Sequence, residues 1–383
     1  MTTVDALIIG AGPAGTSCAA TLAKRGWRVV IIDKSTFPRH KTCGGFIGPE
    51  NKALLSDLGI WSKLLEQGAC IVEQSIITAS KGASTIMPIE GQALGVSRQL
   101  LDTLLSNCVK ATGVTVYEGA LVRNLYNDGE GFDVTIDHYG KNIKCSLRTR
   151  HVIDTSGNHS PQDNVSNIQL GIAALYENMP QALGRVMLHC CKDGHVGINP
   201  FENNQVNVCY VVESKHFEVK QRDPEKVLVD WVVENPHLYK VMREAKRISP
   251  WKAVLIPSRK SVTLFEKGIW RAGDAAAFID TVIGGGISVG LLSGRLLALA
   301  LTEYNQDDDR LKVYTHNYQQ HFSGQRRLAS LVGNLVHHPW AAETIIRLLD
   351  TNYRLRKAAM SYSRPVAVIK NRIRYIKGDL LEV

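Results

Sequence analysis

The chain has 383 residues, a formal net charge of +9, 44% hydrophobic residues and 21% charged residues. These values are typical of a globular protein and exclude a disordered or collagen-like chain. The length allows two domains or one large interleaved unit. No apolar stretch predicts a membrane span, because the best one, 287–300, contains Arg295. We expect a cytoplasmic protein, since the N-terminus lacks the basic lead and the cleavage site of a signal peptide.

The cysteine pattern predicts no metal site. None of the eight cysteines forms a C-x-x-C pair, and their spacing suits neither zinc nor a disulfide framework. His189, Cys190 and Cys191 are adjacent in the chain, but neighbouring side chains on a strand point to opposite faces. We therefore expect small buried thiols instead.

The first predicted elements form a strand–turn–helix–strand unit. An apolar strand precedes Gly10, Gly12 and Gly15, which have the spacing G-x-G-x-x-G, and a helical pattern and a second apolar strand follow. In this context Gly10 permits the tight turn, Gly12 lets the backbone approach a pyrophosphate, and Gly15 lets helix and strand pack closely. Asp33 ends the second strand, where an acid binds ribose hydroxyls. The unit predicts a dinucleotide site at the N-terminus of the helix.

Helical and extended patterns alternate in the next part of the chain. The expected elements are a basic, glycine-rich loop over 34–50, a helix over 51–65, extended chain over 70–88, a helix over 97–112 with Ser97 as its N-cap, a strand over 114–117, and a strand over 151–154 that enters Thr155-Ser156-Gly157-Asn158.

Residues 168–215 predict an antiparallel sheet, most clearly the pair 194–200 and 206–212. The remaining expected elements are a helix over 223–244, extended chain over 251–257, a strand over 268–274, a long helix over 287–304 that Gly284–Gly286 opens, and further helices to the C-terminus.

The C-terminal region is strongly basic. Between Arg326 and Lys377 there are eleven Lys or Arg residues and two acids, Glu343 and Asp350. Such a region suits an acidic protein partner or a phosphate group, and a solvated helical face would have the same composition. Nothing in the chain resembles a nucleic-acid-binding module, so we expect no nucleic acid.

Three separated segments resemble the flavoprotein superfamily that contains aromatic hydroxylases, flavin-dependent halogenases and geranylgeranyl reductases. They are the opening glycine fingerprint, Asp154-Thr155-Ser156-Gly157 and the run AGDAAAFID at 272–280. The resemblance covers roughly residues 1–325. It implies bound FAD in an α/β, Rossmann-like domain with a parallel sheet, interleaved with an antiparallel-sheet substrate domain and followed by a basic helical region. The expected boundaries are 1–75, 96–163 and 268–325 for the FAD-binding domain, 76–95 and 164–267 for the substrate sheet, and 326–383 for the C-terminal region.

The resemblance also assigns residues to FAD. It places Arg98 beside the cofactor, Asp274 on the ribityl chain, and the amides of 284–287 at the flavin N1–C2=O edge. A helix N-terminus there would stabilise the negative charge of reduced flavin. The expected FAD-binding set is Gly10, Gly12, Ala14, Gly15, Asp33, Lys34, Arg39, Cys43, Gly44, Gly45, Arg98, Gly273, Asp274, Gly284, Gly285, Gly286 and Ile287.

Two motifs bear on the branch of the superfamily. Halogenases carry Trp-x-Trp-x-Ile-Pro, but the matching stretch 252–257 keeps only Ile256 and Pro257, which argues against halogenation. The loop Cys43-Gly44-Gly45 resembles that of geranylgeranyl reductases. Their aromatic Tyr-x-Trp-x-Phe-Pro segment corresponds here to 195–200, HVGINP, which suits a polar or aromatic substrate better than an isoprenoid chain.

These features favour an FAD-dependent monooxygenase that hydroxylates an electron-rich aromatic substrate through a flavin C4a-hydroperoxide. His195 is the candidate base or hydrogen-bond donor, Cys43 the candidate redox or flavin-contact residue, and His195, Asn199 and Tyr210 the candidate substrate pocket. Ser156 stands where hydroxylases that use NADPH directly have aspartate. NAD(P)H is therefore expected to act indirectly, through a separate flavin reductase.

Other functions remain open. One is an alkene reductase of the geranylgeranyl reductase type, which the Cys43 loop favours. Another is a modification factor that oxidises a side chain, such as a tryptophan, of a partner protein in the maturation of a quinone cofactor. The basic tail would then dock an acidic protein, and a substrate tethered to a carrier protein would look the same in sequence. A flavin-binding protein without catalysis is the last alternative.

Overall fold

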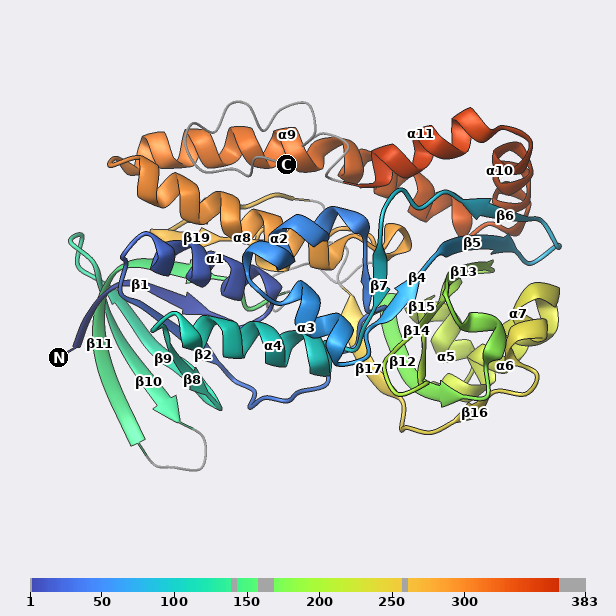
Figure 1. Cartoon of the computed structure of the whole chain (residues 1–383), viewed down its shortest axis with the longest axis horizontal. Coiled ribbons are helices and arrows are strands. Elements are labelled where there is room, and N and C mark those ends of the chain that lie inside the picture. Colours follow the sequence, from blue (N-terminus) through green and yellow to red (C-terminus); the bar gives the residue numbers. More distant parts are fainter. Residues whose placement is uncertain (1, 139–142, 158–168, 257–260, 365–383) are drawn as a thin grey trace.

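The strands gather into two large sheets that draw on stretches far apart in the chain (Figure 1). The computed structural model describes residues 2–138, 143–157, 169–256 and 261–364, and within them the strands form two eight-stranded sheets and one three-stranded sheet. The chain passes from the first large sheet to the second and back. This arrangement confirms the predicted α/β fold with interleaved sheets.

The first sheet contains the parallel core that the opening sequence predicted. Its strands are β1 (Thr2–Ile9), β2 (Val29–Asp33), β8 (Thr115–Glu118), β9 (Ala120–Asn127), β10 (Phe132–His138), β11 (Ile143–Asp154), β18 (Phe265–Glu266) and β19 (Ile269–Arg271). The order β19–β11–β1–β2–β8 is parallel throughout, while β9 and β10 extend it as an antiparallel hairpin. Because parallel strands end at the same edge, the turns after β1, β11 and β19 lie together.

Helices cover this sheet and bury its apolar residues. They are α1 (Pro13–Lys24), α4 (Arg98–Ala111) and α8 (Gly286–Glu303). Helix α8 runs against α1 at close range, because a Cβ at Gly294 would overlap the carbonyl oxygen of Ala14. By length and composition α8 is apolar enough to span a membrane, but 78% of that stretch is buried inside the protein, as in a core helix.

The second sheet is antiparallel except where β13 pairs with β5. It contains β5 (Gln74–Ala79), β6 (Ser84–Met87), β12 (Gln169–Glu177), β13 (Arg185–Cys191), β14 (Gly194–Pro200), β15 (Val206–Glu213), β16 (Lys246–Arg247) and β17 (Lys252–Ile256). One face packs on α6 (Pro224–Glu234) and α7 (Pro236–Met242), and Trp231 of α6 is fully buried against the sheet. Helix α5 (Ser214–Val219) follows β15.

The remaining elements join the two sheets. The small sheet consists of β3 (Phe46–Ile47), β7 (Ala93–Gly95) and β4 (Cys70–Val72), and the helices are α2 (Lys52–Asp57), α3 (Trp61–Glu66), α9 (Asp307–Val336), α10 (Pro339–Thr351) and α11 (Tyr353–Ser363). In Figure 1, α9 lies over α8, while α10 lies beside β5 and β6. The predicted helical C-terminal region is thus present to Ser363, and the basic residues beyond Arg364 lie outside the described part of the chain.

Three predicted elements are divided in the structure. The expected helix over 51–65 breaks between α2 and α3, where Gly59 takes a positive φ of 69°. The expected extended segment 70–88 forms β4, β5 and β6, and the expected helix over 223–244 divides at Asn235. Asn235 caps α7 by accepting hydrogen bonds from the amides of His237 and Leu238, which fixes the break.

Candidate functional site

The glycine turn after β1 is built for close backbone contact. Gly10 has φ +105°, and a Cβ there would lie 2.6 Å from the carbonyl oxygen of Thr155. A Cβ at Gly15 would overlap the carbonyl oxygen of Gly10. The Thr155 hydroxyl donates to the carbonyl oxygen of Gly10 at 2.8 Å, so the turn after β11 braces the glycine turn. Two of the three separated sequence segments therefore meet here.

Gly12 opens onto two cationic side chains. A Cβ at Gly12 would lie 3.7 Å from Nη2 of Arg39 and 3.8 Å from Nη2 of Arg98. Helix α1 begins directly after Gly12 and has no side-chain cap, so its first amides remain available to a ligand. Two guanidinium groups and a helix N-terminus around one glycine form a cradle that fits the pyrophosphate of FAD.

A buried carboxylate holds these cations in place. Asp102 is wholly buried and accepts hydrogen bonds from Nε and Nη2 of Arg98, each at 2.8 Å, and from Nε of Arg39 at 3.2 Å. Burial opposes the charge of Arg98, but Asp102 and Cys43 keep the pKa of Arg98 above its ordinary value. Arg98 is thus a buried member of the site. Asp102 was not predicted as a site residue, although its spacing of four residues from Arg98 in a helix was a usable signal.

Asp33 connects this network to the glycine turn. Its side chain is 4% exposed. The carboxylate accepts a hydrogen bond from the amide of Ala11 at 2.7 Å and forms an ion pair with Nη1 of Arg39 at 3.1 Å. Its predicted contact with the ribose of FAD stays a prediction. Lys34 follows it with an exposed side chain.

The second flavin signature lies on the other side of the cradle. Gly273 has φ +62°, a Cβ there would lie 2.9 Å from Cβ of Ala14, and its amide donates to Ser293 Oγ at 2.9 Å. The neighbouring Asp274 lies close enough to raise the pKa of Lys41, although burial and the charge of Arg98 prevail and lower that pKa. The side chain of Lys41 is open to solvent in a recess that protein atoms surround on most sides.

Helix α8 presents its N-terminus as the sequence predicted. Gly284 has φ +62°, Gly285 is the N-cap without a capping side chain, and nothing lies within 4 Å of a Cβ built on Gly286. Ile287 is buried in the core behind them. The backbone at Gly286 is therefore open to a ligand such as a flavin edge, whereas Gln325 occupies the space beside Gly285.

The loop of Cys43, Gly44 and Gly45 is fastened to the second sheet. Asn199 Nδ2 donates to the carbonyl oxygen of Gly44, and Asn207 Nδ2 donates to that of Cys43, each at 3.0 Å. A Cβ at Gly45, where φ is +67°, would overlap a neighbouring ring. Asn199 was predicted as a substrate contact, but its side-chain NH₂ holds this loop. The matching role of Asn207 was not predicted.

Cys43 lies between a cation and a second thiol. Its sulfur interacts with Arg98, and it is near enough to Cys209 that its charge would raise the pKa of that thiol. Burial is the larger cause and raises the pKa of Cys209 to about 12. The sulfur of Cys209 lies 3.7 Å from the Cβ position of Gly44.

His195 and Tyr210 lie on opposite faces of the second sheet. His195 Nε2 lies 3.4 Å from Thr281 Oγ1 and Nδ1 lies 3.4 Å from Nε2 of His337, and burial and His337 lower the pKa of His195 to about 3. Tyr210 packs beside Trp231, and its hydroxyl donates to the backbone carbonyl of Pro224, the first residue of α6. The predicted grouping of Tyr210 with His195 and Asn199 was wrong, since opposite residues of paired strands share a face and Tyr210 pairs with Val196.

A cavity of about 670 Å³ lies where the basic loop meets the second sheet, and we call it the loop–sheet cavity. Its walls come from the loop of 38–43, the start of α4, β12, the connection 201–207 and residues 249–252. Arg98 and Cys43 line it, so it reaches the charged network described above.

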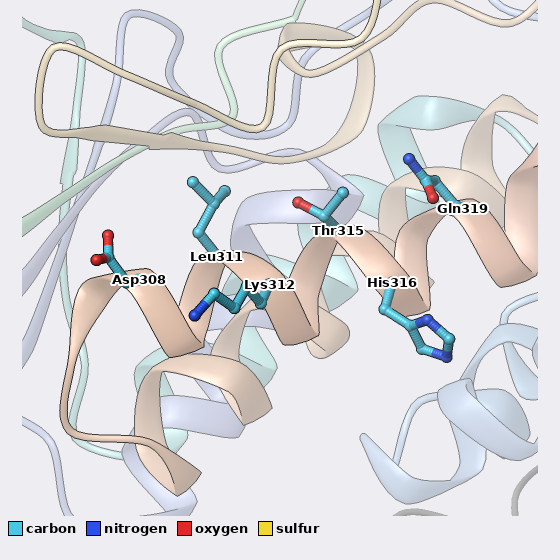
Figure 2. Close-up of a pocket in the computed structure, with 6 residues that line it drawn as sticks. All are labelled: Asp308, Leu311, Lys312, Thr315, His316 and Gln319. Atoms are coloured by element: carbon cyan, nitrogen blue, oxygen red, sulfur yellow. The ribbon is translucent and has the colours of Figure 1, made fainter.

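A second hollow of about 440 Å³ is lined by residues 308–319 of α9, and none of the residues that line it belongs to the network of Asp33, Arg39, Arg98 and Asp102. In Figure 2, Leu311, Thr315 and Gln319 rise from one side of the helix, while His316 points away. Among the described residues no group of three or more His, Cys, Asp or Glu side chains could hold a metal ion.

Residues 3–324 match the family model described as an FAD binding domain, and the chain belongs to that family. It is a flavoprotein oxidoreductase with FAD as its cofactor. It is 25% identical over 353 residues to menaquinone reductase of Mycobacterium tuberculosis, covering 86% of this chain and 84% of the relative. It is 21% identical over 354 residues to 1H-pyrrole-2-carbonyl-[peptidyl-carrier protein] brominase of Pseudoalteromonas luteoviolacea, covering 88% and 85%. The structure of the flavin-dependent brominase Bmp2 superimposes with a TM-score of 0.82 at 18% identity, covering 98% and 99%.

Proposed function

We propose that this flavoprotein is an FAD-dependent monooxygenase that hydroxylates a polar, electron-rich aromatic substrate. The observation that carries the proposal is the loop–sheet cavity, which opens beside Cys43 and Arg98 and has amide and cationic side chains in its walls. An isoprenoid chain would favour apolar walls, whereas a hydroxylated or charged ring would be solvated by these groups.

The chain supplies position and exclusion of water. Bound FAD would supply the electron transfer and the activation of oxygen. Asp102 fixes the two guanidinium groups that would hold the pyrophosphate, and Asn199 and Asn207 fix the loop of Cys43. His195 is neutral at physiological pH and contacts Thr281 in the turn before α8, so we assign it to positioning that turn. Reduced flavin would come from a separate flavin reductase.

Product analysis tests the proposal. The FAD-loaded protein is reduced without oxygen, mixed with isotopically labelled oxygen and offered a panel of phenols and indoles. One labelled oxygen atom in the product supports hydroxylation. Substrate consumed equally well in the absence of oxygen, with no labelled oxygen in the product, would overturn it.

An alkene reductase is the second candidate, and Cys43 favours it. Its thiol lies beside the guanidinium of Arg98, where it could hand a proton to a substrate carbon as hydride arrives. The similarity to a menaquinone reductase supports the same class. In the anaerobic arm of the experiment this function predicts a product that has gained two hydrogen atoms.

A further inference from the structure

The loop–sheet cavity has an excess of positive charge. Four basic side chains line it, His40, Lys41, Arg98 and Lys252, against one carboxylate, Glu202. Both oxygens of Glu202 already accept hydrogen bonds from the amide and the hydroxyl of one residue, Ser97. The carboxylate is therefore held at the N-terminus of α4, and among the described residues it forms no ion pair with any of these four basic side chains.

The four basic groups fall into two pairs. At the inner end, Arg98 is paired with Asp102, and Lys41 lies near Asp274. At the outer end, the side chains of His40 and Lys252 form no ion pair or hydrogen bond with any residue in the described part of the chain. His40 and Lys252 are exposed side chains that line the same cavity, and burial and the charge of Lys252 both lower the pKa of His40. An anion between them would relieve this repulsion.

The rest of the cavity wall suits a compact apolar body. Leu100, Leu175, Phe201 and Pro250 contribute apolar surface to the same cavity that the basic pair and Cys43 line. A ligand that fills the cavity would then carry its charge at one end and its ring or chain along these side chains. Its uncharged end would lie towards Cys43.

We propose that the loop–sheet cavity binds an organic anion, with a carboxylate or phosphate head at His40 and Lys252 and an apolar or aromatic body directed towards Cys43. Organic anions of this kind would be the substrate class of the proposed monooxygenase. The reaction that they undergo in the cavity rests on the proposed function. The head group has two sources that share this chemistry: an acidic group of the substrate itself, or the phosphate of an arm that tethers the substrate to a carrier.

Calorimetric titration of the FAD-loaded protein tests the site with defined probes. Benzoate and phenyl phosphate should bind, and benzamide, which is neutral, should bind at least about tenfold more weakly. The variants Lys252→Gln and His40→Gln should each weaken the anions about tenfold and leave benzamide unchanged. Lys81→Gln, at an exposed lysine in the turn between β5 and β6, is the matched control and should change nothing.

The affinities of the probes distinguish the two sources of the head group and test the site itself. Tighter binding of 4′-phosphopantetheine than of phenyl phosphate assigns the head to a carrier arm, and tighter binding of benzoate than of either assigns it to the substrate. Equal affinity for benzoate and benzamide, or full anion affinity in Lys252→Gln, would overturn the site. Anion binding without incorporation of labelled oxygen would instead overturn the monooxygenase and leave the site standing.

Discussion

Replacing Asp102 by asparagine is expected to destabilise the apoprotein by about 3–5 kcal/mol, the usual cost of removing one member of a buried charge network. The wild-type carboxylate is wholly buried and accepts three hydrogen bonds from two guanidinium groups, at 2.8, 2.8 and 3.2 Å. Asparagine has the same shape but no charge, and its amide NH₂ would face the donors of Arg98 or Arg39. Arg98 would then lose its carboxylate partner in the interior, while Arg39 would keep its pair with Asp33.

Urea unfolding of the apoprotein, followed by circular dichroism, measures the change. The matched control is Asp137→Asn, which breaks a surface pair with Arg123 and should cost at most about 1 kcal/mol. Excess FAD should recover part of the loss in Asp102→Asn, because its pyrophosphate would bring negative charge to the same guanidinium groups. An unfolding midpoint for Asp102→Asn equal to that of Asp137→Asn would show that the network is not the structural centre of the site.

Three further predictions follow from the described contacts. Burial holds the pKa of folded His195 at about 3, well below its ordinary value, so the unfolded chain binds a proton first as the pH is lowered. The melting temperature should therefore fall as the pH is lowered from about 6.5 towards 4. The variant His195→Gln should show a smaller fall over the same range. The Glu50 side chain is buried at the N-terminus of α8, where it pairs with Arg364 at 3.5 Å and its negative charge would disfavour a reduced, negatively charged flavin. Glu50→Gln should therefore raise the reduction potential of bound FAD by roughly 30 mV, and Arg364→Gln should lower it. Equal potentials for the wild type and both variants in a spectroelectrochemical titration would contradict this. Tyr210→Phe should cost about 1 kcal/mol of stability in urea unfolding and leave turnover unchanged, and a large loss of turnover would return Tyr210 to the active site.

The parts of the fold that were predicted correctly depend on local signals. The opening unit places strand, glycine turn, helix and acid within 33 residues, and each glycine has a steric reason that the structure bears out at Gly10 and Gly15. The break in the predicted helix over 51–65 was missed because the apolar spacing continues through Gly59 while the backbone turns there.

The parts of the site that were missed depend on contacts between distant segments. Alternation along β15 shows that Tyr210 and Asn207 lie on different faces, but it does not show which face meets the flavin loop. Asp102 has an ordinary helical spacing from Arg98, and only the tertiary structure brings Arg39 from another loop to the same carboxylate. Such pairings follow from topology and cannot be predicted from local pattern.

Titration of the apoprotein with FAD tests most directly whether the three separated segments build one cofactor site. Wild-type protein and Gly324→Ala, where a Cβ meets nothing within 4 Å, should each bind one FAD per chain. Gly15→Ala should lose FAD binding while it remains folded, since its Cβ would overlap the carbonyl oxygen of Gly10 in the turn that we propose holds the pyrophosphate. Undiminished FAD binding by Gly15→Ala, or none by the wild type, would contradict the assignment of the cradle.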